Sequence, residues 1–319
     1  MQNPKNLTLI LLIVILTISL ARVICQPPPN MGMQPTPPYT IGYGADNPIT
    51  TNLTFIGNWK VFAAGSVEDS KYMNLTYSVY TWTITPPPIR GYIRYAYLYI
   101  ARGFYDTADR WTVLFDSVPL AQNAYTAPYN YDSYIDVVKI DVRNYIVYGY
   151  HTYNITIIVN SGDFIIYCMG MVVISESILF RPSYIWLNDG NEWIYNAISR
   201  TNFTDLGQPD GWKAKFYVFA SGGEVNRTDN LYFDGNLIAT NPFNGSSGFL
   251  SDFDVYDVTG MMGSGSHYAE FQAFNDGITI HFAIIEYVSP ALDEYSGARV
   301  LLSILIVIAL LMIGKLRGS

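Results

Sequence analysis

Cysteine is almost absent from the sequence, since the 319 residues contain only two, Cys25 and Cys168. Two cysteines cannot form the set of disulfides that stabilises many small exported domains. If Cys25 is removed with an N-terminal signal, Cys168 has no partner in the mature chain. Cys168 lies in the apolar run FIIYCMGMVVI, where a buried and unreactive thiol is expected. The hydrophobic core must therefore stabilise the fold.

Charged side chains are also scarce, and basic ones are the scarcer kind. They make up 14% of the chain, with 18 Lys and Arg against 26 Asp and Glu, so the net charge is −8 and the pI about 4.8. Nucleic-acid binding requires clustered Lys and Arg, and the sequence has no such cluster. The composition excludes a nucleic-acid partner and suits a secreted surface.

Histidine, the residue that catalytic and zinc sites use most often, occurs only at His151, His267 and His281. None of the three accompanies a Ser or Cys nucleophile motif. For His281, within ITIHFAII, we expect a strand histidine with a satisfied ring. The sequence also lacks an H-E-x-x-H motif, a cysteine cluster and a phosphate-binding glycine loop. It therefore predicts no zinc site, no nucleotide partner and no cofactor.

Carboxylates are the remaining candidates for chemistry. Asp116 with Asp234, and Asp136 with Asp254, could form the acid pairs of a glycoside hydrolase. Because the members of each pair recur in two similar stretches, we interpret them as residues that hold hairpins and strand ends, and we predict that the protein is not an enzyme. Asp229, Asp234 and Asp254 offer oxygen ligands suited to Ca²⁺, but no complete ligand spacing accompanies them, so no metal site is predicted.

A long hydrophobic run stands near the N-terminus. Lys5 precedes LTLILLIVILTISLA, and a proline-rich stretch follows, which is typical of a secretory signal peptide. We expect the signal to cover residues 1–25, with cleavage after Cys25; cleavage after Ala21 and an uncleaved signal anchor are the alternatives. The segment QPPPNMGMQPTPPY, residues 26–39, is expected to be an extended polyproline spacer.

A second run, VLLSILIVIALLMIG, lies between Arg299 and Lys315. As a helix it would span about 22 Å, which is shorter than the ~30 Å hydrocarbon core, but the flanking basic side chains can reach the interfaces. We predict a transmembrane helix over 299–316, after a juxtamembrane linker at 290–298. By the positive-inside rule the tail at 317–319 would be cytoplasmic, so the rest of the protein would face outward from the cell membrane.

Aromatic residues are abundant, at 15% of the chain, and they alternate with other residues in runs such as YIRYAYLYI. This pattern predicts strands. Short strands bounded by Gly, Asn, Asp and Pro indicate antiparallel sandwiches. The predicted fold is all-β, with two related antiparallel β-sandwich units at 40–178 and 179–289.

The two units are expected to be copies of one another. VLFDSVPLA aligns with LYFDGNLIA at an offset of 118 residues, and the same offset would place Asp136 opposite Asp254. Asp234-Gly235 suits a tight hairpin, because both central residues of that turn favour positive φ. The other copy is expected to reverse over a longer break at 117–119.

Several motifs resemble an archaeal, methanogen-type family of exported surface proteins of unknown function. The matching segments are Ala96–Tyr99, Phe115-Asp116, Val137–Ile140, Val172–Glu176, Ile185–Asn191, Phe233–Gly235 and Asp257–Thr259. The most specific is W-L-N-D-G-N at 186–191, with Asp189 where the family has Glu. The first copy departs from the family by having Lys139-Ile140 in place of Asp-Val. The resemblance implies export and a duplicated β fold, and it supplies no catalytic residues.

Two sets of residues are the candidate functional positions. Six Asn-x-Ser/Thr glycosylation acceptors lie between the hydrophobic runs: Asn52, Asn74, Asn154, Asn202, Asn226 and Asn244. The segment NAYTAPYNYDSY carries four tyrosines that could bind a ligand or stack on sugar rings: Tyr125, Tyr129, Tyr131 and Tyr134. The same tyrosines could instead cover the edge of the sandwich.

Together these features predict a membrane-anchored extracellular glycoprotein that acts as a structural or adhesive module of an archaeal cell envelope. Its partners would be the membrane, through the C-terminal helix, and other envelope proteins or glycans. A carbohydrate-binding surface lectin is the alternative, and a surface glycoside hydrolase is a more remote one.

Overall fold

The computed structural model describes residues 47–68, 70–103, 110–124, 135–204, 211–223, 228–245, 251–263, 265–274 and 277–290. These residues form four antiparallel sheets and two short 3-10 helices, η1 (Arg143–Tyr145) and η2 (Thr259–Met261). The all-β, antiparallel prediction is confirmed. The predicted signal, spacer and transmembrane helix lie outside the described residues. Within those residues, no helix is long and apolar enough to cross a bilayer.

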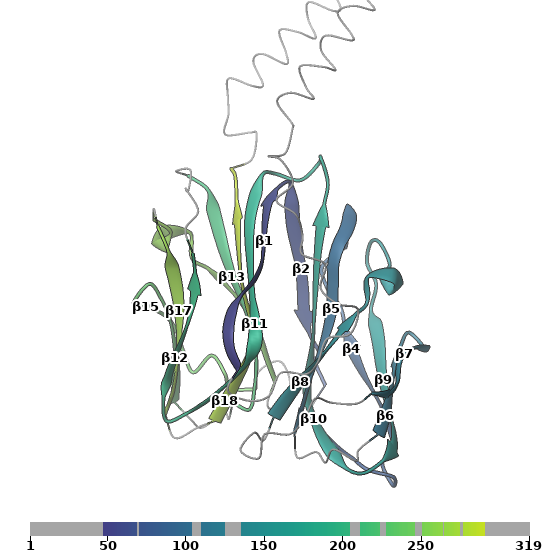
Figure 1. Cartoon of the computed structure of the whole chain (residues 1–319). Coiled ribbons are helices and arrows are strands. Elements are labelled where there is room, and N and C mark those ends of the chain that lie inside the picture. The colour runs from purple at the N-terminus through teal and green to yellow at the C-terminus, as the bar shows by residue number, and fades with distance from the viewer. Residues whose placement is uncertain are drawn as a thin grey trace, which may run out of the picture.

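The four sheets stack as four layers, which follow one another across the view in Figure 1. The first outer sheet has the order β4 (Val79–Ile84), β9 (Tyr153–Ser161), β6 (Arg110–Phe115) and β7 (Val118–Ala124). The first inner sheet has the order β2 (Trp59–Gly65), β10 (Phe164–Glu176), β5 (Tyr92–Gly103) and β8 (Ile135–Asp141), with β3 (Lys71–Met73) also on β10. The second inner sheet has the order β1 (Asn47–Gly57), β11 (Ser183–Tyr195), β18 (Gly277–Val288), β13 (Lys213–Ser221) and β16 (Ser251–Asp257). The second outer sheet has the order β12 (Ile198–Phe203), β17 (His267–Phe274), β14 (Thr228–Phe233) and β15 (Asn236–Thr240).

Each outer sheet packs on its inner sheet through a hydrophobic core. Alternation of the strands produces these cores; in β9, for example, Tyr153, Ile155 and Ile157 are buried while the residues between them are not. Trp82 and Trp111 are fully buried in the first core, and Phe216 and Phe233 in the second. The two sandwiches are therefore each closed by their own apolar contacts.

A third core joins the two inner sheets face to face. It is rich in aromatic residues, with Tyr99 of β5 packing 5.1 Å from Phe282 of β18 between ring centroids. The strands of the inner sheets are consequently buried on both faces, and β10 is buried over almost its whole length. The two sandwiches form one body with a continuous interior.

The two halves share one strand order. The inner-sheet series β10-β5-β8 matches β18-β13-β16, and the outer-sheet series β4-β9-β6-β7 matches β12-β17-β14-β15. Contacts between the inner sheets are reciprocal, because β8 lies against β11 and β16 lies against β2. β10 and β18 also end at the same end of the body. Their last residues, Glu176 and Val288, pair with Trp59 and Ser183. The Trp59 N–H donates to the Ser183 hydroxyl, so the two strand ends lie close together. This is the relation expected of one unit repeated about a twofold axis that runs along the strands.

β1 departs from this simple partition. It belongs by sequence to the range predicted for the first unit, yet it pairs with β11 in the second inner sheet. A single residue, Asn58, separates it from β2, which lies in the first inner sheet. Gly57 has φ 136, a backbone conformation that suits glycine, and the Ser183 hydroxyl donates to its carbonyl oxygen at 3.2 Å. The chain therefore crosses from one half to the other at the turn between β1 and β2.

The two corresponding hairpins have the same turn. Phe115 pairs with Val118 and Phe233 with Asn236, so each reversal has two central residues. Asp116 and Ser117 have φ 48 and 67, and Asp234 and Gly235 have φ 49 and 76. The longer break predicted at 117–119 is wrong, because Ser117 adopts the left-handed conformation that Gly235 adopts more easily.

The predicted alignment of Asp136 with Asp254 is also wrong. Asp136 stands opposite Arg102 on β5, and the matching position on β13, Ala220, stands opposite Asp252. The offset is therefore 116 between β8 and β16, whereas it is 118 between β5 and β13. With this register Asp141-Val142 matches Asp257-Val258, so the first copy has the Asp-Val pair after all. Both valines donate a backbone hydrogen bond to matching alanines, Val142 to Ala96 and Val258 to Ala214.

Candidate functional site

The aspartates of the two hairpins hold the turns against the neighbouring strand. Asp116 Oδ1 accepts from the backbone N–H of Asn154 at 2.9 Å, and its Oδ2 is 2.7 Å from His151 Nε2. Asp234 repeats this arrangement, with Oδ1 accepting from the Tyr268 N–H at 2.9 Å and Oδ2 2.5 Å from His267 Nδ1.

These aspartates do not form an acid pair with one another. Asp116 ends a strand of the first outer sheet and Asp234 a strand of the second outer sheet, with both inner sheets between them. The carboxylate separation that glycoside hydrolysis requires is about 5–10 Å. The interpretation that Asp116 and Asp234 hold hairpins is confirmed.

Asp136 forms a buried ion pair inside the first sandwich. Its carboxylate accepts from Arg102 Nε at 3.3 Å and from Nη2 at 3.1 Å, and both side chains are almost fully buried. The guanidinium lies over the rings of Trp111 and Phe164, at 5.6 and 5.5 Å from the centroids. Burial raises the pKa of Asp136, while the charge of Arg102 lowers it. Asp254 lies elsewhere, where Tyr256 donates to it at 3.1 Å.

The segment W-L-N-D-G-N lies on β11 and connects three layers. The Trp186 indole donates to the Thr204 carbonyl at 3.1 Å, and the Asn188 amide donates to the Thr201 hydroxyl at 2.8 Å. Asp189 points to the other face of β11, as the alternation of a strand requires, and contacts the first inner sheet. The motif that appeared most specific in the sequence is therefore a structural connection.

Asp189 is the acceptor of a buried cluster between the inner sheets. Lys139 Nζ donates to its Oδ2 at 2.5 Å and the Tyr99 hydroxyl donates to the same atom at 2.9 Å. The Lys139 ammonium also lies 4.7 Å from the Tyr97 ring centroid. Burial, followed by the charge of Asp189, raises the pKa of Tyr99. The cluster satisfies a charge pair that would otherwise be costly to bury.

Two further polar side chains, Glu286 and His281, form hydrogen bonds in this central layer. Glu286 accepts from the Tyr217 hydroxyl at 2.7 Å and from the backbone N–H of Val61, on the other inner sheet, at 3.0 Å. His281 contacts the Ser221 hydroxyl at 2.8 Å and the Asn191 amide oxygen at 2.9 Å, so the expectation of a satisfied strand histidine is confirmed. Burial lowers the pKa of His281 to about 3, which keeps the ring neutral.

Sequence reasoning missed the central polar layer, although the sequence carried a signal for it. Lys139 follows the apolar pair Val137-Val138 in IDVVKID, and Glu286 stands in ITIHFAIIEYV. A charged residue inside a strand that is apolar on both faces requires a buried partner. Cys168 is buried in the same layer, as predicted.

The described glycosylation acceptors lie on outward positions. Asn154 on β9 and Asn202 on β12 are exposed strand residues of the outer sheets, while Asn74 and Asn244 are partly exposed in loops. Asn52 lies on β1, and its side chain is outside the described set, as is Asn226. Asn74 Oδ1 accepts from the backbone N–H groups of Thr76 and Tyr77, both at 2.8 Å, and so holds its own turn.

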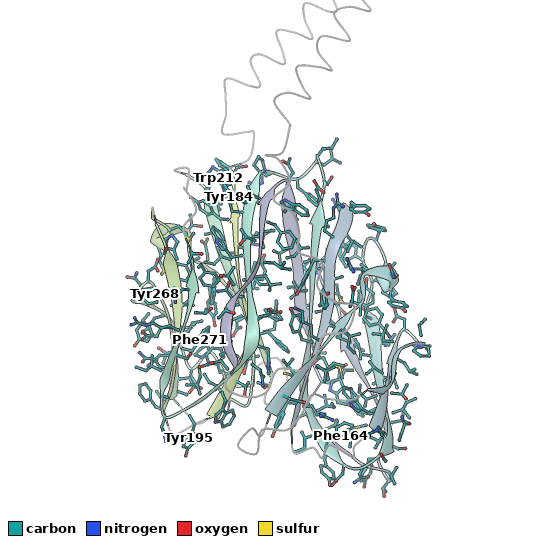
Figure 2. The ribbon with its side chains drawn as sticks, in the orientation of Figure 1. Phe164, Tyr184, Tyr195, Trp212, Tyr268 and Phe271 are labelled. Atoms are coloured by element: carbon teal, nitrogen blue, oxygen red, sulfur yellow. The ribbon has the colours of Figure 1, made fainter. Side chains whose placement is uncertain are left out.

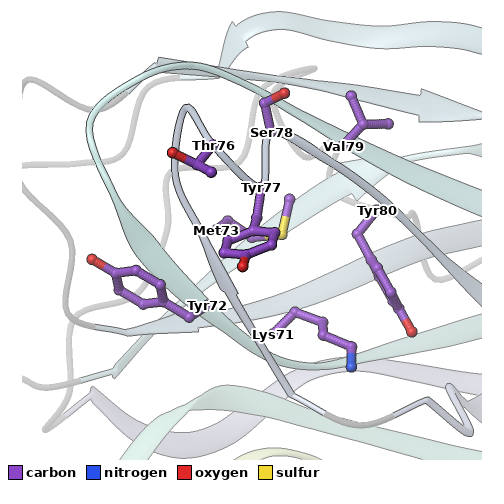
Figure 3. Close-up of a pocket in the computed structure, with 8 residues that line it drawn as sticks. All are labelled: Lys71, Tyr72, Met73, Thr76, Tyr77, Ser78, Val79 and Tyr80. Carbon is purple, nitrogen blue, oxygen red and sulfur yellow. The ribbon is translucent and has the colours of Figure 1, made fainter.

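The four tyrosines predicted to bind a ligand, Tyr125, Tyr129, Tyr131 and Tyr134, lie outside the described residues. A different group of tyrosines lines an open pocket of about 570 Å³ between β3 and β4. Figure 3 shows the rings of Tyr72, Tyr77 and Tyr80 around it, with Lys71 at its border. The Lys71 ammonium is 5.0 Å from the Tyr80 ring centroid, and the Tyr72 hydroxyl donates to Asp163. The repeated tyrosines of KYMNLTYSVY were the available signal.

No metal site emerges from the described residues, which contain no group of three or more His, Cys, Asp or Glu arranged to hold an ion. Asp229 and Asp234, named above as ligands suited to Ca²⁺, lie on β14 and in the turn after it, whereas Asp254 lies on β16 of the inner sheet.

The chain belongs to the protein family described as "Protein of unknown function (DUF3344)", whose model matches residues 42–291. This range contains all the sheets described above. A search of curated proteins finds no match to the chain.

Three of the solved structures that match the chain are distant likenesses. A conserved protein of unknown function from Pseudomonas aeruginosa PAO1 is 7% identical with a TM-score of 0.29, over 73% of this chain and 100% of that one. A β-porphyranase of glycoside hydrolase family 86 from Bacteroides plebeius is 9% identical with a TM-score of 0.23, over 66% and 34%. The major capsid protein P2 of bacteriophage PM2 is 10% identical with a TM-score of 0.21, over 69% and 97%. Scores this low support no inference about function.

Proposed function

We propose that this DUF3344 protein is a membrane-anchored extracellular glycoprotein that serves as a structural or adhesive module of an archaeal cell envelope. The signal-like run at 1–25 and the apolar run at 299–316 would place the β body outside the cell. The archaeal assignment rests on the resemblance of the W-L-N-D-G-N segment and its neighbouring motifs to an archaeal family.

The observation that carries this proposal is the outward placement of the acceptors. Asn154 and Asn202 are exposed on the two outer sheets, on opposite sides of the body, and the inner sheets are closed by the third core. Glycans on both flanks would leave the packing undisturbed and shield the sheets from their surroundings. A rigid body with glycans on its flanks suits a role in which the protein persists at a surface.

The direct test combines membrane extraction with glycopeptide analysis of the native protein. The full chain should remain with membranes after a high-salt and carbonate wash, and truncation before Arg299 should release it into the medium. Mass spectrometry should find glycan on Asn154 and Asn202. Recovery of the full chain from the cytosol with unmodified asparagines would overturn the proposal.

A carbohydrate-binding surface lectin is the second candidate, and the pocket of Tyr72, Tyr77 and Tyr80 supports it. Tyr77 is 69% exposed and Tyr72 is 50% exposed, so their rings are open to a ligand. Exposed tyrosine rings beside hydroxyl and ammonium groups can stack on sugars and donate hydrogen bonds to them.

The lectin test is a glycan array probed with the purified full chain. Tyr77→Ser should abolish binding, whereas Tyr150→Ser, a change at an 84% exposed tyrosine outside the pocket, should leave it unchanged. Equal binding by both variants would discard this site. The same preparations should be assayed for hydrolysis of the bound glycans, since turnover would support the more remote reading as a glycoside hydrolase.

A further inference from the structure

The turn between β10 and β11 exposes two large apolar side chains. Ile178 is 85% exposed and Leu179 is 87% exposed, more than any other large hydrophobic side chain in the described part of the chain. They occupy the two central positions of a turn in which the Phe180 N–H donates to the Ser177 carbonyl at 2.9 Å. Such positions favour Pro, Asn, Asp, Gly and Ser, so Ile-Leu gains nothing locally from being there.

This turn is held firmly at its base. Asn58 Nδ2 donates to the Phe180 carbonyl at 2.8 Å, and the Ser177 N–H donates to the Asn58 carbonyl at 3.0 Å. The Phe180 ring packs against the first core, with its centroid 6.2 Å from that of Phe62. The turn therefore presents Ile178 and Leu179 outward on a fixed support.

The turn lies beside the place where the chain leaves the body. Val288, the last residue of β18, pairs with Ser183, and the Ser289 N–H donates to the Pro182 carbonyl at 2.9 Å. Residues 289–298 then lead to Arg299 and the predicted span. By the twofold relation, the end of β10 corresponds to the end of β18. One half thus leads to the membrane helix, while the other half presents two apolar side chains toward the same side.

Charged side chains of both signs are exposed at this end of the body, where Asp257 of β16 stands opposite Lys215 of β13. Arg90, Arg181 and Lys213 are exposed here, on a chain whose net charge is −8. The nearby carboxylate of Glu176 is occupied by Arg94 at 2.9 Å.

Aromatic side chains complete this end of the body. Tyr92 is 62% exposed, and the Trp212 ring lies 5.3 Å from both Tyr184 and Tyr287 between centroids. Figure 2 shows Trp212 and Tyr184 at this end and Tyr195 at the opposite end. Tyrosine and tryptophan favour the headgroup level of a bilayer, and arginine and lysine bind lipid phosphates.

We propose that Ile178 and Leu179 insert into the outer leaflet beside the transmembrane helix, with Arg90, Arg181 and Lys213 on the lipid phosphates. This inference rests on the membrane anchoring proposed above and adds a second point of attachment. A body held by one helix can tilt and rotate, whereas two contacts on either side of a twofold axis fix its strands upright on the membrane.

The test uses the chain from Gln26 onward, without the predicted signal and its Cys25, reconstituted into vesicles of phosphatidylcholine and phosphatidylglycerol. Leu179→Cys carries an environment-sensitive fluorophore, and Tyr195→Cys, 59% exposed at the far end, is the matched control. The parent without an added cysteine shows whether the buried Cys168 takes up label. Nitroxide-bearing lipid should quench the fluorophore at position 179 and leave position 195 unchanged. Pure phosphatidylcholine should weaken that quenching.

The outcomes separate this inference from the anchoring on which it rests. If the chain does not float with the vesicles at all, the anchor and the proposed function fail together. If the chain floats but positions 179 and 195 are quenched equally or not at all, the anchor stands and the inserted turn is overturned. Equal quenching at 179 in both lipid mixtures would overturn the role of the three cations. As a second variant, Ile178→Ser with Leu179→Ser keeps the turn and should make the distance of position 195 from the bilayer more variable.

Discussion

The two halves of the molecule share a backbone but differ in what they bury. The first half holds the charged pair of Arg102 and Asp136, where the second has Ala220 and Asp252. It also places Lys139 in the central layer, where the second half has Val255. The two halves thus have the same strand order but different buried polar groups, which indicates that the apolar pattern is enough to define the fold.

The two halves also differ in the size of the side chains that they place between the inner sheets. Gly170 on β10 accommodates Phe219 of β13, and their counterparts under the twofold relation are Ile284 and Ala101. A small residue opposes a large one in the first case, and the sizes are reversed in the second. The inner sheets therefore fit each other through complementary differences rather than through identity.

The largest expected effect comes from the lysine that distinguishes the halves. Lys139→Ala leaves Asp189 buried without its cation and should lower the free energy of unfolding by about 3–5 kcal/mol. Val255→Ala, at the matching position, is 46% exposed and should change it by only about 0.5 kcal/mol. Urea denaturation measures both, and similar losses would show that the ion pair does not carry the asymmetry.

The second-largest effect is expected from the contact between Gly170 and Phe219. Gly170→Val should destabilise the protein by about 2–3 kcal/mol, because an added Cβ would lie 2.8 Å from the Phe219 ring. Gly260→Val is the control, since nothing lies within 4 Å of a Cβ there and no positive φ is involved. Thermal unfolding should show a lower Tm for the first variant alone; a wild-type Tm for Gly170→Val would mean that the inner sheets separate easily.

Acid should affect the buried histidine selectively. Burial lowers the pKa of His281 from 6.5 to about 3 in the folded protein. Its contribution to the free energy of unfolding is therefore fully present above pH 6.5 and is lost as the pH falls toward 3. At pH 5 this histidine should lower the free energy of unfolding by roughly 2 kcal/mol.

His281→Gln should remove this part of the pH dependence, whereas His151→Gln, at a partly exposed residue that precedes β9, should keep it. Denaturation curves at pH 7 and pH 5 provide the comparison. An unchanged slope in His281→Gln would show that other groups carry the acid sensitivity.

The smallest effect concerns the two equivalent hairpins. Ser117→Gly should stabilise the protein by about 1 kcal/mol and Gly235→Ser should destabilise it by about the same, because both positions have positive φ. The two changes make the turns exchange residues, so opposite signs in chemical denaturation are the expected result. Equal signs would contradict the equivalence of the turns.

The sequence predicted the strands and the Asp234-Gly235 turn because alternation and turn chemistry are local properties. The sequence-based prediction failed where the structure depends on which strands pair and in which register. Alternation identifies the faces of β1 but cannot tell that it pairs with β11, and a shift of two residues between Asp252 and Asp254 keeps every side chain on the same face. The outward asparagines could be named from the sequence, whereas the Tyr77 pocket and the Ile178-Leu179 turn depend on how distant segments meet.

The crossing of β1 into the other half has a consequence for synthesis. β1, the first of the described strands, is the outermost strand of a sheet whose other members are made later, so it must wait for β11 to leave the ribosome. The two sheets of the first half, made from residues 59–176, can form before β11 exists, but β1 stays unpaired until then. Expressing residues 1–178 and 179–319 as separate fragments should therefore not give two independently folded proteins. The first fragment would carry β1 without its partner strand, and the second would expose β11 as a sheet edge prone to self-association.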